Sequence, residues 1–315
     1  MARTAIKISI IGAGFVGSTI AYTMMAGGTA SDIVLVDANN DRAEGEAMDI
    51  GHGAALAKST SVVRAGGYPD TANSDLVIIT AGTNQKPGET RIDLIKRNAA
   101  IMRDVAQKVA EFSPNTIIMV ISNPVDVMAY IAREVTGFPK HRVIGSGTVL
   151  DSSRFRYAIA KTFDIAPRDV NGYILGEHGD SEFPAWSLTR IAGMNLEEAS
   201  CMFGLCFTDD SYTAIANEVK NAAYEIINRK SATYYGIGMA AMKIAEAIVR
   251  NEDRILPVSV MLNGEYGIHD VYLSLPVILN ERGVKKILTP KLTDDEIAAL
   301  QNSAEVLKQA RESLD

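Results

Sequence analysis

The sequence has little cysteine and no long apolar run, and both shortages exclude classes of protein. Its two cysteines, Cys201 and Cys206, do not form a CxxC pair, so we expect free, buried thiols in a reducing cytoplasm rather than a disulfide. No cluster of His, Cys and carboxylate residues has zinc spacing, so no metal site is predicted. Because there is neither a signal-peptide layout nor an apolar run of membrane-spanning length, we predict a cytoplasmic protein with no membrane partner.

Excess basic charge is also lacking. The chain has 31 basic and 38 acidic residues, which gives a formal net charge of -7 at pH 7. This balance argues against a nucleic-acid partner and against an anionic membrane surface. Any anionic ligand must therefore be held by local cations or by helix N-termini. The 315 residues suffice for one large or two moderate domains.

The first half of the chain alternates short β-branched runs with helical stretches. Near-continuous apolar strands that alternate with helices indicate a parallel sheet covered on both faces. We therefore expect an α/β protein whose N-terminal domain is a doubly wound parallel sheet of the Rossmann type. The expected strands are 6–11, 33–36, 61–65, 76–80, 116–121 and 142–144, and the clearest helices are 15–25 and 92–112.

The pattern changes after Gly147, where we predict a C-terminal α+β substrate domain. The predicted domains are 1–146 and 147–315, and since no low-complexity linker joins them they should share a firm interface and a cleft. Residues Thr293 to Glu296 read as a capping box that opens a C-terminal amphipathic helix. The other expected helices are 151–163, 210–228 and 237–250, and the strands are 172–175, 255–262 and 271–279.

A glycine fingerprint follows the first strand and opens a helix. Gly12 permits the tight turn, Gly14 lets the backbone approach a pyrophosphate, and Gly17 lets helix and strand pack closely. Asp37 ends the next strand, where an acid meets the ribose hydroxyls of an adenosine. A carboxylate there would repel the extra phosphate of NADP, so the pattern predicts NAD. The competing interpretation of Asp37 is a surface residue at a strand end.

His178 lies between two glycines in an acid-rich turn at a strand end, and it can exchange a proton near neutral pH. Asp151 and Arg154 are three residues apart on a predicted helix and share a face. Asp151 could hold the imidazole, and Arg154 could grip a substrate carboxylate with two parallel hydrogen bonds. On spacing alone, a surface ion pair is the favoured interpretation of Asp151 and Arg154.

Two further segments carry candidate ligand contacts. Asn123 follows the fifth strand at the ligand-binding edge of the sheet, but before Pro124 it could equally be a helix N-cap. Residues 82–91 hold breakers of regular structure together with Gln85 and Arg91, so this loop looks like a lid with one cation and one neutral amide.

Together these motifs resemble the L-lactate dehydrogenases of the lactate/malate dehydrogenase superfamily, over nearly the whole chain. The motifs are GAGFVG, ITAG, NQKPGETR, SNPVD, GSGTVLDSSRFR, GEHGDSEFPAW and ATYYGIG, in the family's order. The resemblance makes His178 the proton donor and acceptor, Asp151 its partner, Arg154 the carboxylate anchor and Arg91 the group that polarises the carbonyl. It adds Asn123 and Thr233 as substrate contacts, and Val16, Arg42, Tyr68, Gly82, Thr83, Ser122, Asn123 and Ser146 around the dinucleotide, beside the glycines and Asp37.

The implied reaction converts (S)-lactate and NAD to pyruvate and NADH, the last step of anaerobic glycolysis and fermentation. Gln85 stands where malate dehydrogenases carry a second Arg, which favours pyruvate over oxaloacetate. The motifs leave open a 2-hydroxyisocaproate-type enzyme and a catalytically silent NAD-binding protein. Relatives activated by fructose 1,6-bisphosphate use an Arg and a His at a subunit interface; here Arg156 matches but Asn171 does not, so we expect weak or absent activation. By analogy the protein is a homotetramer.

Overall fold

The computed structural model describes residues 5–57, 60–83 and 91–314, apart from the side chain of Arg91. Its centre is a nine-stranded sheet with the order β13-β12-β11-β6-β5-β4-β1-β2-β3. The segment β3-β2-β1-β4-β5-β6 is parallel and has the strand order of a doubly wound fold. These strands are β1 (Lys7–Ile11), β2 (Asp32–Val36), β3 (Val62–Ala65), β4 (Leu76–Ile79), β5 (Ile117–Val120) and β6 (Val143–Gly145).

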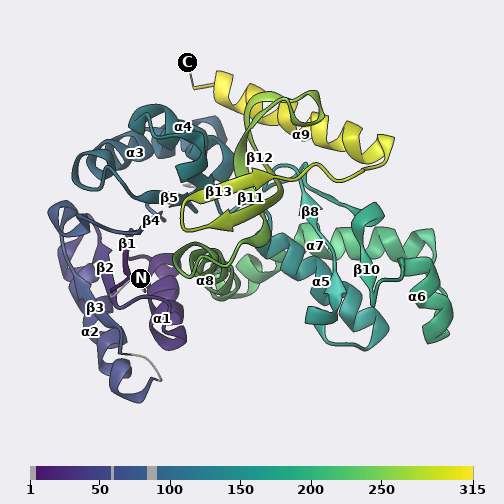
Figure 1. Cartoon of the computed structure of the whole chain (residues 1–315), viewed down its shortest axis with the longest axis horizontal. Coiled ribbons are helices and arrows are strands. Elements are labelled where there is room, and N and C mark those ends of the chain that lie inside the picture. Colours follow the sequence, from purple (N-terminus) through teal and green to yellow (C-terminus); the bar gives the residue numbers. More distant parts are fainter. Residues whose placement is uncertain (1–4, 58–59, 84–90, 315) are drawn as a thin grey trace.

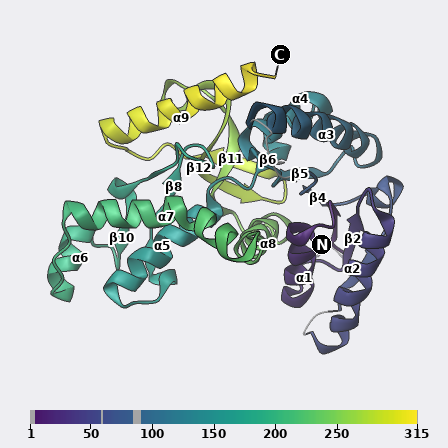
Figure 2. The same ribbon diagram turned by 180° about the vertical axis from the view of Figure 1, so that it is seen from behind.

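The six predicted N-terminal strands are confirmed, with ends that agree to within one residue. All residues of β4 and β5 are buried, because helices cover both faces of the parallel sheet. Figures 1 and 2 show α3 and α4 on one face, with α1 and α8 on the other. The N-terminal helices are α1 (Phe15–Gly27), α2 (Asn40–Gly53), α3 (Arg91–Phe112) and α4 (Val125–Thr136), of which α2 and α4 were not among the predicted helices.

The second half extends the same sheet. Strand β11 pairs antiparallel with β6 through Ser259 and Gly145, so the sheet runs unbroken across the predicted boundary at 146/147. A Cβ atom on Gly147 would lie 2.4 Å from the backbone nitrogen of Ser259, which shows how closely the chain packs there. The strands added to the sheet are β11 (Arg254–Asn263), β12 (His269–Asn280) and β13 (Gly283–Ile287).

Helices and short hairpins make up the rest of the C-terminal half. Helices α5 and α7 pack on one another around a separate small core that includes Phe155 and Phe163. The predicted strand 172–175 is shorter than expected and pairs with β9 only through Ile174 and Leu175. The elements are α5 (Val149–Phe163), β7 (Val170–Asn171), β8 (Ile174–Leu175), β9 (Phe183–Pro184), β10 (Arg190–Ile191), α6 (Leu196–Phe203), α7 (Asp209–Lys230), α8 (Tyr235–Val249) and α9 (Asp294–Glu312).

Helix α9 begins with the predicted capping box. Glu296 N donates to Thr293 Oγ1 at 3.2 Å, and Thr293 N donates to Glu296 Oε2 at 3.0 Å. Figure 1 shows α9 lying across the top of the sheet, with the C-terminus toward α4. None of the helices in the described residues is long and apolar enough to cross a membrane.

The two cysteines differ in part from the prediction. Both are free thiols, as expected, but Cys201 and Cys206 are exposed rather than buried. Cys201 lies in α6 and Cys206 in the segment between α6 and α7. Residues 201–206 lie at the edge of the small core, and all of them are exposed.

Candidate active site

A cavity of about 840 Å³ opens at the carboxyl ends of β1 and β2. A volume of this size is typical of a cofactor site. It lies where the strand order of the parallel sheet reverses, which is the ligand-binding position of doubly wound folds. Of the predicted cofactor residues, Gly12, Gly14, Asp37, Arg42, Tyr68, Gly82 and Thr83 line it.

The three glycines have the steric properties that the fingerprint requires. Gly12 has a φ of 107°, and a Cβ atom there would lie 2.7 Å from Thr80 Oγ1. A Cβ atom on Gly17 would lie 1.8 Å from the Gly12 carbonyl oxygen, so only glycine permits this contact between helix and turn. Gly14 is unobstructed, because a Cβ atom there would meet only Arg42 Nη2, at 4.0 Å. Its backbone is therefore open to the cavity, which fits a bound pyrophosphate.

Asp37 lies at the end of β2 and lines the same cavity. Its Oδ2 accepts a hydrogen bond from Ala13 N at 2.6 Å, and its Oδ1 accepts one from Asn39 N at 2.9 Å. The carboxylate is thus fixed beside the glycine turn. A negative charge held there disfavours a ligand with an extra phosphate.

The remaining predicted cofactor residues do not line this cavity. Val16 packs against the core of the sheet. Ser122 is buried and donates to the carbonyl oxygen of Ala81 at 2.5 Å. Ser146 is also buried, and its backbone nitrogen donates to Val120 O. Of the three, Ser122 contacts the wall of the cavity, because Ala81 lines it.

A second cavity, of about 460 Å³, brings together Asn123, Asp151, Arg154 and His178. These residues come from the segment after β5, from α5 and from the turn after β8, with α3 and α7 supplying apolar walls. Asn98 of α3 links the two cavities: its Oδ1 accepts from Thr83 N at 2.9 Å, and its Nδ2 donates to Asn123 O at 3.0 Å.

The N-cap interpretation of Asn123 is wrong. Helix α4 begins at Val125, its N-cap residue is Pro124, and no side chain caps it. Pro124 therefore stands one position before the first helical residue, whereas an N-cap at Asn123 would require Pro124 to be the first helical residue. This leaves the Asn123 side chain without a capping role, on the wall of the cavity that holds His178.

Asp151 joins His178 and Arg154 into one ion-pair network. Asp151 Oδ2 lies 2.7 Å from His178 Nδ1, and Asp151 Oδ1 accepts from Arg154 Nη1 at 2.8 Å. The Asp151 side chain is only 2% exposed, so the surface ion-pair interpretation is wrong. Burial alone would raise the pKa of Asp151, but the neighbouring His178 and Arg154 outweigh it and lower that pKa.

The ionised Asp151 fixes the state of His178. A carboxylate can only accept, so His178 Nδ1 carries the proton of their hydrogen bond and Nε2 is left for another ligand. Burial opposes the imidazolium, yet Asp151, followed by Glu182 and Asp126, raises the pKa of His178 to about 9. At neutral pH the ring is therefore a charged proton donor.

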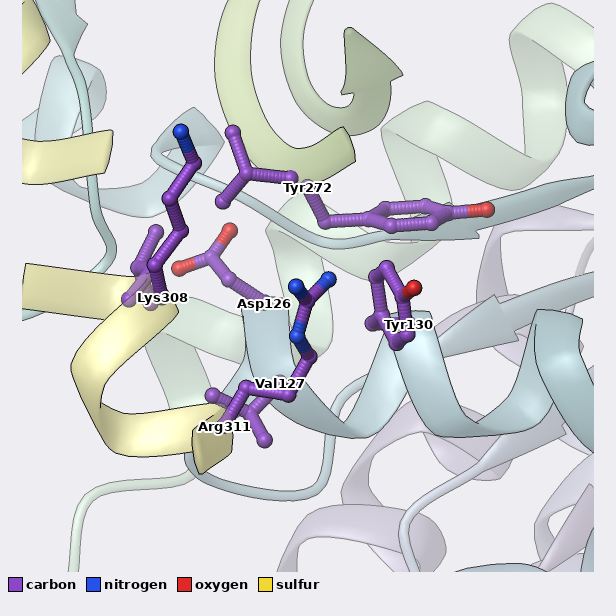
Figure 3. A pocket seen from close by; sticks show the side chains of 8 residues that line it. Asp126, Val127, Tyr130, Tyr272, Lys308 and Arg311 are labelled. Carbon is purple, nitrogen blue, oxygen red and sulfur yellow. The ribbon is translucent and has the colours of Figure 1, made fainter. Parts of the chain in front are cut away.

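Asp126 was not predicted as a site residue, but it holds the backbone of the histidine turn. It is buried in the first turn of α4, where its Oδ2 accepts from His178 N at 2.9 Å and its Oδ1 accepts from Ser259 Oγ at 2.5 Å. Figure 3 shows it beside Lys308 and Arg311 of α9, around a space of about 10 Å³. Burial raises the pKa of Asp126 to about 6 despite both hydrogen bonds.

Glu182 is the second site residue that the sequence reasoning missed. It lines the His178 cavity, and one of its carboxyl oxygens lies within 4.8 Å of ligand atoms of Asp151 and His178. Together, Asp151, His178 and Glu182 could hold a metal ion, although both Asp151 oxygens already bond to other side chains. Glu182 belongs to the GEHGDSEFPAW motif, and its distance of four residues from His178 was the available signal.

The structure does not place the other predicted residues in these cavities. Gln85 lies outside the described residues, as does the side chain of Arg91. Thr233 is not among the residues that line the His178 cavity. Arg156 donates to Ser152 O at 3.3 Å, and burial lowers its pKa, whereas Asn171 is exposed on β7. Within the described part of the chain, no hydrogen bond joins Arg156 to Asn171.

Comparison with known proteins places the chain in a family. Residues 6–145 match the model of the lactate/malate dehydrogenase NAD-binding domain, and residues 148–314 match that of the α/β C-terminal domain. The chain is 52% identical to L-lactate dehydrogenase 1 of Clostridium acetobutylicum, with 98% of each chain covered. A crystal structure of minor L-lactate dehydrogenase from Enterococcus mundtii, in the ligands-bound form, matches with a TM-score of 0.96 and 45% identity, covering 99% of each chain.

Proposed function

Because the chain belongs to the lactate/malate dehydrogenase family, we propose that it catalyses the reversible conversion of (S)-lactate and NAD to pyruvate and NADH. The observation that carries the proposal is the network of His178, Asp151 and Arg154 in a cavity next to the nucleotide cavity. The curated relative and the solved structure both bear the name L-lactate dehydrogenase. An NAD-dependent oxidoreductase that acts on a 2-hydroxy acid anion needs a proton carrier and an anion anchor beside its cofactor, and the side chains of His178 and Arg154 fit these two roles.

In the proposed mechanism, NAD supplies the hydride acceptor for lactate and, as NADH, the hydride donor for pyruvate. Arg154 binds the substrate carboxylate while its Nη1 remains bonded to Asp151. His178 Nε2 gives a proton to the carbonyl oxygen of pyruvate, or takes one from the hydroxyl of lactate. Asp151 keeps the imidazole in the tautomer that exposes Nε2 and stabilises its charged form. The side chains of Asn123 and Thr233 are proposed to contact the substrate.

The loop of residues 82–91 is proposed to act as a lid over this site. Arg91 is proposed to polarise the substrate carbonyl, and Gln85 to accept the uncharged tail of a 2-keto acid. Oxaloacetate would bring a second carboxylate to a position without a matching cation, at a cost of roughly 3–5 kcal/mol for an unpaired buried charge. We therefore expect pyruvate to be favoured over oxaloacetate by roughly two to three decades or more, as ~1.4 kcal/mol corresponds to tenfold.

The assembly and regulation of the protein are proposed by analogy. We propose a cytoplasmic homotetramer with domains 1–146 and 147–315, and weak or absent activation by fructose 1,6-bisphosphate. The exposed, uncharged Asn171 supports the last point, because a phosphate group is held best by charged donors.

An assay of NADH oxidation with three 2-keto acids tests the proposed function. We expect turnover with pyruvate, with oxaloacetate slower by about 10²–10³-fold as derived from the unpaired charge. A faster reaction with oxaloacetate would identify a malate dehydrogenase, and a faster reaction with 2-ketoisocaproate would identify a 2-hydroxyisocaproate-type enzyme. Binding of NADH without turnover of any of the three would support the silent protein.

A further inference from the structure

Glu182 places a second carboxyl group in the cavity of the proton donor, where the mechanism above gives it no task. It precedes β9 and is partly buried. One of its carboxyl oxygens lies within 4.8 Å of Asp151 and His178 atoms. Both carboxylate oxygens of Asp151 are already bonded, one to His178 and the other to Arg154. An ionised Glu182 would therefore be an additional anion at the position that a substrate anion must approach.

The other charged groups among the described residues of this cavity do not remove the excess, because the one further cation, Lys220, is outnumbered by Glu177 and Asp180. Arg154 and a protonated His178 balance Asp151 and one substrate carboxylate, which leaves nothing among these four groups to balance Glu182. A charge 4–6 Å away shifts the pKa of a carboxyl group by about one to three units. The same repulsion would weaken the binding of a substrate carboxylate by about 10- to 1000-fold. Among the described residues, the titratable groups that line the cavity with Glu182 are Asp151 and Arg154 of α5, Glu177, His178 and Asp180 of the turn after β8, and Lys220 and Tyr224 of α7.

We propose that Glu182 is a specificity-determining residue that must carry a proton for a 2-keto acid anion to bind. This inference rests on the proposed function, because it concerns the same cavity and substrate. The Glu182 proton is neither transferred nor consumed. It removes a negative charge, so that productive binding of pyruvate requires two bound protons, one on His178 and one on Glu182.

The electrostatics of the site support this assignment. Burial, followed by the charge of Asp151, raises the pKa of Glu182 to about 8, against the opposing effects of His178 and Arg154. Because Glu182 and His178 influence each other, they titrate as a pair with two macroscopic steps. Both steps lie above neutral pH, so at pH 7 both groups hold their protons and the site accepts one anion.

The number of protons that pyruvate binding requires sets the slope of kcat/KM against pH. If both protons are needed, kcat/KM for pyruvate falls with a limiting slope of -2 above the second step, about 100-fold per pH unit. In Glu182→Gln only His178 titrates, so the slope becomes -1, about 10-fold per pH unit. The midpoint in the variant should also move to lower pH, because the charge of Glu182 helps to raise the pKa of His178.

The experiment measures kcat and KM for pyruvate from about pH 6 to 10.5 in the full-length wild-type protein, in Glu182→Gln and in Glu182→Ser. Glu218→Gln, which removes an exposed acid on α7, is the matched control for the change in net charge. We expect the steep rise of KM at high pH in the wild type and the control, and a shallower rise in both Glu182 variants. The slope is a property of protonation, so a merely structural role of Glu182 would not change it.

Two results would overturn the inference. A wild-type slope of -1 would show that a single proton suffices, whatever the variants do. A slope of -2 that persists in Glu182→Gln or Glu182→Ser would place the second proton elsewhere. Failure of the wild type to turn over pyruvate at any pH is a different outcome, since it removes the proposed function itself.

A second measurement counts the protons directly. Oxamate, in which an amino group replaces the methyl group of pyruvate, is added to the wild-type protein with NADH in weak buffer above pH 9.5. The quantity measured is the number of protons taken up from solution when oxamate binds. More than one proton per site in the wild type, and at most one in Glu182→Gln, supports the inference. Uptake of at most one proton in the wild type at saturating oxamate contradicts it.

Discussion

Replacement of Asp151 by Asn tests the central ion-pair network most sharply. The change keeps the size of the side chain but removes the negative charge that lies 2.7 Å from His178 Nδ1 and 2.8 Å from Arg154 Nη1. Asp151 is the strongest of the influences that raise the pKa of His178, and burial opposes it. In Asp151→Asn we therefore expect the pKa of His178 to fall from about 9 toward its ordinary value of 6.5.

The size of the effect follows from the fraction of protonated imidazole. With a pKa of 6.5 instead of about 9, that fraction falls about fourfold at pH 7 and about 10²-fold at pH 9. The loss of kcat/KM for pyruvate should therefore grow with pH. Lactate oxidation needs neutral His178, so at neutral pH it should suffer less from the protonation change. Loss of the bond to Arg154 should add a rise in KM that does not depend on pH.

The assay is a pH profile of kcat/KM for pyruvate, with Asp169→Asn as a control that removes an exposed acid from the same half of the chain. The step of the profile that reports His178 should lie near pH 9 in the wild type and the control, and about two pH units lower in Asp151→Asn, as the pKa of about 9 implies. A profile for Asp151→Asn that still falls near pH 9 would refute the reasoning, because it would show that Asp151 does not set the charge of His178.

Three further predictions concern other parts of the site. Arg91→Gln should lower kcat for pyruvate reduction by about 10²-fold or more, the scale for losing one donor to a developing oxyanion, and an unchanged turnover number would rule out its role. Gln85→Arg should raise the ratio of oxaloacetate to pyruvate activity, and a constant ratio would show that Gln85 does not read the substrate tail. Asp126→Ala leaves His178 N and Ser259 Oγ without their acceptor, so it should lower the free energy of unfolding by about 1–3 kcal/mol or more in urea denaturation. Ser259→Ala, which keeps the bond to His178, should cost less, and equal losses would argue against the bond to the histidine turn.

Local patterns were sufficient for the strands of the parallel half of the fold, though not for α2 and α4. Strands such as β4 and β5 are short, apolar and bounded by breakers, so they can be read without knowledge of their neighbours. The glycine turn is also a local pattern, because Gly12, Gly14 and Gly17 span one turn and the start of one helix, although the close approach of Gly12 to Thr80 appears only in the fold. By contrast, the pairing of Ser259 with Gly145 joins residues far apart in the sequence. No local pattern predicts that the sheet continues from β6 to β11.

The chemical groups of the candidate site divide in the same way. The sequence by itself determined which side chains can carry a proton or an anion, since His178, Asp151 and Arg154 lie in recognisable motifs. Only the tertiary structure decided their charges, because a pKa depends on burial and on neighbours brought from other elements. Asp126 and Glu182 become part of the site for that reason: their carboxyl groups matter through their distances from His178, and folding alone sets those distances.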